Sequence, residues 1–106
     1  MSQTNPEPRS MTLDEFTPHV GKLFTLHASP DEVEIELVEA YPLRENAFAP
    51  RPPFQLIFRS GPDVLLMGGS FVMRTKGFGP DVVYISQTNP PPGDQRGGHY
   101  YQAVFN

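Results

Sequence analysis

The most regular hydrophobic pattern in the chain is the alternation Glu-Val-Glu-Ile-Glu-Leu over residues 32–37. Successive side chains of a β-strand point to opposite faces, so Val33, Ile35 and Leu37 should share a buried face, with the three glutamates in solvent. Val38 interrupts the alternation, which predicts a β-bulge or burial on both faces. The segment is therefore predicted to be a strand with one buried face and one solvent-exposed face.

Shorter apolar segments, separated by Gly, Pro and Asp, predict five more strands, at residues 23–26, 54–59, 70–75, 81–86 and 99–105. Residues 64–67 are also apolar and could be either a hairpin arm pairing with 70–75 or a connector. Short strands with no long helical pattern favour one all-β domain. We expect a small antiparallel β-sandwich or barrel of about six strands.

One short N-terminal helix is expected in addition. Thr12 to Glu15 has the spacing of a capping box, and Met11 and Phe16 have the spacing of a hydrophobic staple. Pro18 would clash with the carbonyl of Asp14, which limits the helix to a turn or two. Such a short element should act as a lid or plug on the sheet.

The two ends of the chain differ in pattern. Residues 1–10 are polar and interrupted by prolines, so they are predicted to form a disordered leader before a single β domain at residues 11–106. The last seven residues have the composition of a core strand, with Tyr101, Ala103 and Phe105 facing inward. Loss of residues 104–106 should therefore unfold the domain.

Composition and charge exclude several classes of protein. The net charge is −4 and the eight Lys and Arg residues are dispersed, which argues against a nucleic-acid partner. The chain contains no Cys, so disulfides and Cys-ligated zinc are excluded. No signal peptide or membrane-spanning run is recognisable, and we expect a soluble, cytoplasmic protein without a membrane partner.

No residue pattern indicates catalysis, and no cofactor is expected. His19, His27 and His99 are the only histidines and lack metal-ligand spacing. The glutamates of residues 32–39 lie at a spacing that resembles paired acid and base carboxylates, but a solvated face paired with Lys22, Arg59 or Arg74 is the simpler interpretation. A metal-binding or small-molecule site on this face, such as that of a hydrolase, stays open as the alternative.

Two connections, residues 42–53 and 87–98, are longer than the usual connection of roughly 4 to 6 residues and are where we look for function. Their prolines either stiffen the loops or present polyproline II to a partner, and Phe48 either plugs the core or anchors a partner. The candidate interaction residues are Phe48, Arg51, Pro52, Pro91 and Arg96.

These observations favour a non-enzymatic protein-interaction or assembly module. It would use the long loops or an exposed sheet edge, because six strands leave edges unless the sheet closes. A protein partner or self-association is expected.

Several segments, taken in order, resemble an uncharacterised bacterial family of short all-β domains. They are Met11-Thr12-Leu13-Asp14-Glu15-Phe16, Pro53 to Arg59, Leu66-x-x-Gly69-x-Phe71 and the terminal Tyr101-Gln102-Ala103-Val104-Phe105-Asn106. The resemblance implies that residues 66–69 are a connector, and it associates the family with phage-tail-collar-like proteins. It transfers no catalytic residue. Thr75-Lys76 stands where the family usually has His-Pro.

Overall fold

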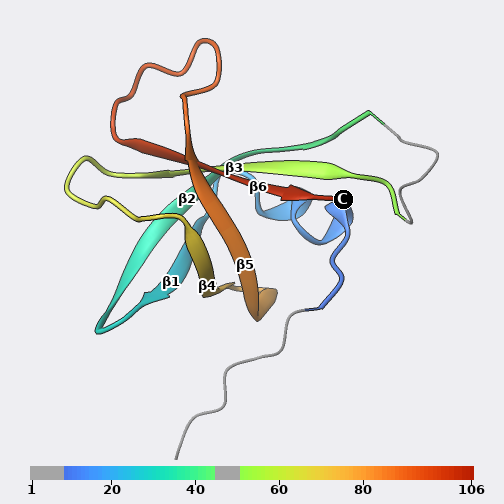
Figure 1. The fold of residues 1–106 in the computed structure, drawn as a ribbon, viewed down its shortest axis with the longest axis horizontal. Helices are drawn as coiled ribbons and strands as arrows, with labels where there is room; N and C mark the ends of the chain where they lie inside the picture. The colour runs from blue at the N-terminus through green and yellow to red at the C-terminus, as the bar shows by residue number, and fades with distance from the viewer. Residues whose placement is uncertain (1–8, 45–50) are drawn as a thin grey trace, which may run out of the picture.

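The structure is a computed structural model that describes residues 9–44 and 51–106. It contains two short 3-10 turns and six strands, which confirms the expected all-β fold with one short N-terminal helical segment (Figure 1). The turns are η1 (Leu13–Glu15) and η2 (Thr17–His19), and the strands are β1 (Leu23–Ala28), β2 (Asp31–Pro42), β3 (Phe54–Ser60), β4 (Gly69–Thr75), β5 (Phe78–Thr88) and β6 (His99–Phe105).

The six strands form a closed antiparallel barrel in the order β1-β2-β3-β6-β5-β4, with β4 returning to pair with β1. Of the two architectures left open by the sequence, the structure therefore selects the barrel. Closure also corrects the expectation of an exposed sheet edge, because every described strand has a neighbour on both sides. The sequence did not indicate closure because closure depends on long-range pairing. The last strand, β6, inserts between β3 and β5, so β3 does not pair with β4, the strand that follows it in sequence.

Strand β2 has the two faces that its alternation predicts. Ile35 and Leu37 are fully buried, whereas Glu32 and Glu34 are exposed. Its register to β3 shifts between Leu37 and Glu39, so the predicted bulge at Val38 is confirmed. The bulge lets one long strand pair with β1 through its first half and with β3 through its second half.

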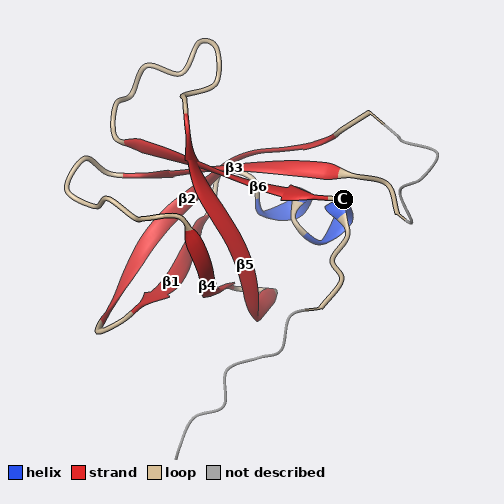
Figure 2. Ribbon diagram, viewed as in Figure 1, coloured by secondary structure: helices blue, strands red, loops and turns tan. Residues whose placement is uncertain are grey.

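The N-terminal helical segment closes one end of the barrel, as predicted. The carboxylate of Glu15 accepts a hydrogen bond of 2.8 Å from the Thr12 N–H, which is the glutamate half of the capping box. Phe16 is fully buried, with its ring centroid 4.8 Å from that of Phe78. In Figure 2 both turns, drawn in blue, lie beside the C-terminal end of β6.

Residues 61–68 are a connector from β3 to β4 and not a hairpin arm. The buried Tyr101 hydroxyl accepts a 3.0 Å hydrogen bond from the Leu66 N–H and is 2.9 Å from the Ser60 hydroxyl. Gln87 donates its side-chain amide to the Leu66 carbonyl at 3.0 Å. Side chains of β5 and β6 thus hold the connector in the absence of a strand ladder.

Strand β6 contributes Tyr101 and Ala103 to the core, and Phe105 packs against the core at the rim, as predicted. The strand pairs with β3 over seven positions but with β5 over only three, Tyr100 to Gln102. Past those three pairs β5 and β6 diverge (Figure 1). Arg9 contacts β5 at Asp81, so this residue lies along the partly open seam.

Candidate functional site

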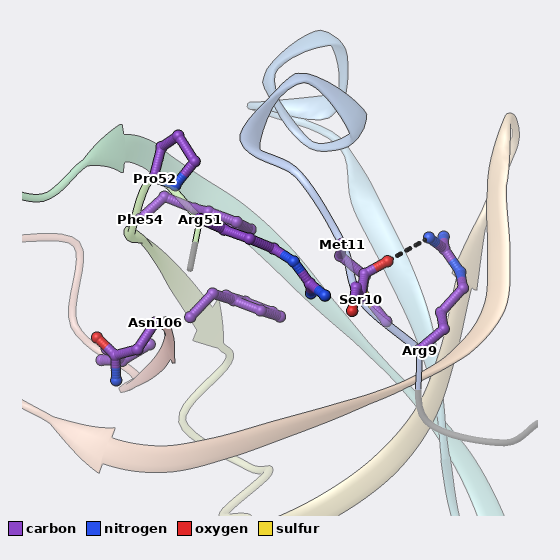
Figure 3. Close-up of a pocket in the computed structure, with 9 residues that line it drawn as sticks. Arg9, Ser10, Met11, Arg51, Pro52, Phe54 and Asn106 are labelled. Atoms are coloured by element: carbon purple, nitrogen blue, oxygen red, sulfur yellow. Dashed lines mark hydrogen bonds between the residues drawn. The ribbon is translucent and has the colours of Figure 1, made fainter. Parts of the chain in front are cut away.

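Two adjoining hollows lie at the end of the barrel where β3 begins and β6 ends, and we call this region the mouth. The first has a volume of about 470 Å³ and is shown in Figure 3. The second has a volume of about 390 Å³ and is largely apolar. Both are lined by Met11, Arg51, Pro52 and Phe54. The first is completed by Arg9, Ser10, Val104, Phe105 and Asn106, and the second by Thr12, Leu13, Asp14, Pro42 and Pro53.

Aromatic rings form the inner wall of the mouth. Phe54 and Phe105 are partners in the β3–β6 ladder, and their rings stack with centroids 4.4 Å apart at an interplanar angle of 8°. Phe16, which is fully buried, contacts both rings at centroid distances of 5.9 and 5.8 Å. The pair therefore separates a solvent-open hollow from the packed core.

A strap of residues 9–11 forms the opposite wall. The Arg9 guanidinium donates two hydrogen bonds of 2.9 Å to the Asp81 carboxylate and one of 2.6 Å to Glu15. These hydrogen bonds, first to Asp81 and then to Glu15, raise the pKa of Arg9 above its usual value, and the bond from Arg9 lowers the pKa of Glu15. Met11, two residues on, is buried in the core. Both ends of the strap are thus anchored.

The predicted interaction residues do not form one surface. Arg51 and Pro52 line the mouth, whereas Pro91 and Arg96 belong to the loop before β6, at the opposite end of the β3–β6 pair. Six residue steps of about 3.3 Å along a strand separate the two ends by roughly 20 Å. Phe48 lies outside the described residues.

Arg96 is occupied by contacts that hold its own loop. It pairs with Glu36 at 2.7 Å and with Asp94 at 2.9 Å, and its hydrogen bonds hold the pKa of Asp94 well below the usual range. Arg59 donates to the Gly97 carbonyl at 2.7 Å in the same loop. These contacts fold the loop back over β2 and β3.

Arg51, by contrast, points into the first hollow. Figure 3 shows its side chain extending toward Ser10 with the ring of Phe54 beside it. Within residues 9–44 and 51–106, no carboxylate forms an ion pair with Arg51, although five ion pairs involve arginines 9, 74 and 96. The mouth therefore offers a guanidinium beside an aromatic wall.

The histidines and the glutamate face of β2 make surface or core contacts and do not gather into one site within the described residues. His27 lies opposite Glu32 in the β1–β2 ladder, with 3.2 Å between Nε2 and Oε2, and Arg74 reaches the same carboxylate at 3.1 Å. All three side chains are about half exposed, as is usual for cross-strand polar contacts on a solvated face. His19 is buried against Phe24 instead. In the part of the chain that the structure describes, no three His, Asp or Glu side chains converge as metal ligands would.

Sequence reasoning missed the strap and its contact with Asp81. Arg9 falls in the segment predicted to be a disordered leader, of which residues 1–8 lie outside the described residues. The one available signal was Asp81, a carboxylate that directly precedes the apolar run 82–85 and is buried in the structure. A buried carboxylate needs a partner, but its chain position does not say which one.

Neither helical turn within the described residues is long and apolar enough to cross a membrane. No curated protein and no solved structure matches the chain. A family model described as a domain of unknown function does match, over residues 11–105, which span the helical segment and all six strands of the barrel. The chain therefore belongs to the domain-of-unknown-function family DUF6916.

Proposed function

We propose that this barrel is a non-enzymatic protein-interaction or assembly module that binds its partner at the mouth. The observation that supports this is the chemistry of the mouth, where a solvent-open hollow combines a stacked aromatic pair with a guanidinium. The second hollow, which adjoins the first, has the mostly apolar walls that are usual for binding sites in proteins. Aromatic and arginine side chains are also enriched among residues that dominate binding energy.

The sequence suggested the two long loops or an exposed sheet edge as binding surfaces, and the mouth now takes their place. A closed barrel leaves no full-length strand edge to recruit another strand, and the loop before β6 is held by Arg59 and Arg96. Of the two long connections, only the one that carries Arg51 and Pro52 contributes residues to the mouth. The resemblance to a family associated with phage-tail-collar-like proteins makes such assemblies the first partners to test.

Site-specific cross-linking in the native cell tests this function. A photoreactive residue at position 52 should form a cross-linked protein product, while one at exposed Gln95, on the opposite loop, should not. The product is then identified, purified and titrated against the domain. A bulky Ser10→Trp change in the mouth should weaken binding, and Gln95→Trp should leave it unchanged.

Two results would contradict the proposal. One is a strict monomer by light scattering with no product at position 52. The other is a purified partner whose affinity responds to Gln95→Trp and not to Ser10→Trp, since binding would then lie at the opposite end of the barrel.

A further inference from the structure

We infer that the first hollow of the mouth binds a carboxylate carried on a small apolar body. This inference rests on the site of the proposed function and names the chemical group recognised there. Two sources would present that chemistry, the C-terminal residue of a partner peptide and a free small organic acid. The charge, the walls and the size of the hollow each favour such a ligand.

The charge of the hollow favours an anion. A guanidinium is planar, always charged and able to donate two parallel hydrogen bonds to a carboxylate. The mouth has two of them, but Arg9 already donates to Asp81 and Glu15. Arg51 is therefore the group that would bind the ligand. Among the residues that the structure describes, the acidic side chain of Asp14 lines the second hollow and not the first.

The walls and the size favour an apolar body beside that anion. The stacked rings of Phe54 and Phe105 and the side chain of Met11 give the hollow one apolar side. Ser10 and Asn106 supply polar groups at its rim. The volume of about 470 Å³ falls within the roughly 300 to 1,000 Å³ typical of sites for small ligands.

An NMR titration with two matched probes tests the inference. N-acetylphenylalanine carries the carboxylate, and N-acetylphenylalaninamide carries the same apolar body without the charge. The acid should shift the amide signals of residues 51–54 and 104–106 and saturate, and the amide should bind at least about tenfold more weakly because a charged hydrogen bond is lost. Equal binding of the two probes, or no shift at these residues, would overturn the inference.

Two arginine variants separate the role of Arg51 from a general effect of charge. Arg51→Gln should weaken binding of the acid by about tenfold or more, while leaving signals outside the mouth unchanged. Arg44→Gln is the matched control, because Arg44 is exposed on the same connection but lines neither hollow. Wild-type affinity in Arg51→Gln would show that Arg51 does not hold the carboxylate.

A peptide that ends in phenylalanine with a free carboxylate distinguishes the two sources. Tighter binding of this peptide than of N-acetylphenylalanine, lost when its C-terminus is amidated, identifies a peptide terminus as the ligand. Equal affinity of peptide and free acid identifies a small-acid site. If cross-linking at position 52 captures a protein, and that protein still binds the Arg51→Gln variant with wild-type affinity, the proposed function stands and this inference fails.

Discussion

Arg9 and Asp81 are 72 positions apart in the chain, yet two hydrogen bonds of 2.9 Å join the guanidinium of one to the carboxylate of the other. The Asp81 side chain is only 12% exposed, whereas that of Arg9 is 42% exposed. The carboxylate is thus the member of the pair that depends on its partner. This contact fixes the strap that walls the mouth and covers the seam between β5 and β6.

Replacing Arg9 should therefore destabilise the fold more than a typical surface substitution does. Arg9→Gln leaves the Asp81 carboxylate largely buried without its cation, which should lower the free energy of unfolding by about 1 to 3 kcal/mol. Urea denaturation measures the change, with Arg44→Gln as a control expected to lie within about 0.5 kcal/mol of wild type. Equal stability of both variants would mean that the strap is not anchored by this pair.

The same cluster predicts an acid dependence of stability. Because Arg9 lowers the pKa of Glu15 in the folded state from its ordinary value of 4.5, the stabilisation from Glu15 is fully present above that value. It is lost as the pH falls below 4.5 through the folded-state pKa. Urea denaturation at a series of pH values should show this decline, and the decline should be shallower in Arg9→Gln. Identical pH profiles would contradict the link between Arg9 and Glu15.

Deleting Val104 to Asn106 should unfold the domain. The deletion removes the Phe105 ring from Phe54 and Phe16 and shortens the β3–β6 ladder. Loss of a fully buried phenylalanine costs about 3 to 5 kcal/mol, and the partly buried Phe105 should cost less than that. Together with the lost ladder pairs of residues 104 and 105, this is a large part of the roughly 5 to 15 kcal/mol that stabilises a domain. Circular dichroism on heating is the measurement. Deleting Asn106 alone, which lies after β6, should change little, and an unchanged melting temperature for the longer deletion would refute the prediction.

Tyr101→Phe isolates the hydrogen bonds that hold the connector. Without the hydroxyl, the buried Leu66 N–H loses its acceptor and Ser60 loses a partner, at a cost of about 1 to 3 kcal/mol. Hydrogen exchange of the Leu66 amide should accelerate along with the loss of stability. Tyr84→Phe, at a tyrosine that is 62% exposed, is the matched control and should have little effect. Unchanged exchange at Leu66 in Tyr101→Phe would show that the connector is held by other contacts.

Two glycines allow the cost of a positive φ to be separated from the cost of a steric clash. Gly93 and Gly98 have nearly the same φ, +86° and +88°, but a Cβ on Gly93 would meet open space and one on Gly98 would collide with the Ser60 carbonyl. Gly93→Ala should cost about 1 to 2 kcal/mol, and Gly98→Ala clearly more. Equal losses of stability in urea would mean that the loop shifts away from β3 without cost.

Local pattern was enough to predict all six strands, the bulge at Val38 and the plugging role of the helical segment. These features depend on interactions within a few residues, such as the alternation of residues 32–37 or the capping contact between Thr12 and Glu15. The mouth was predicted only in part. Arg51 and Pro52 were singled out because their loop is long, but nothing local placed them beside the strap or the end of β6.

The sequence by itself thus determined which residues form strands and which faces they bury, because side-chain alternation is a property of each segment alone. Only the tertiary structure decided that β6 inserts between β3 and β5, that the sheet closes, and that the two long loops lie at opposite ends. Those outcomes depend on pairing between segments far apart in the chain, such as Phe54 with Phe105 and Arg9 with Asp81. Their energy comes from burial and charge pairing that exist only once the barrel has formed.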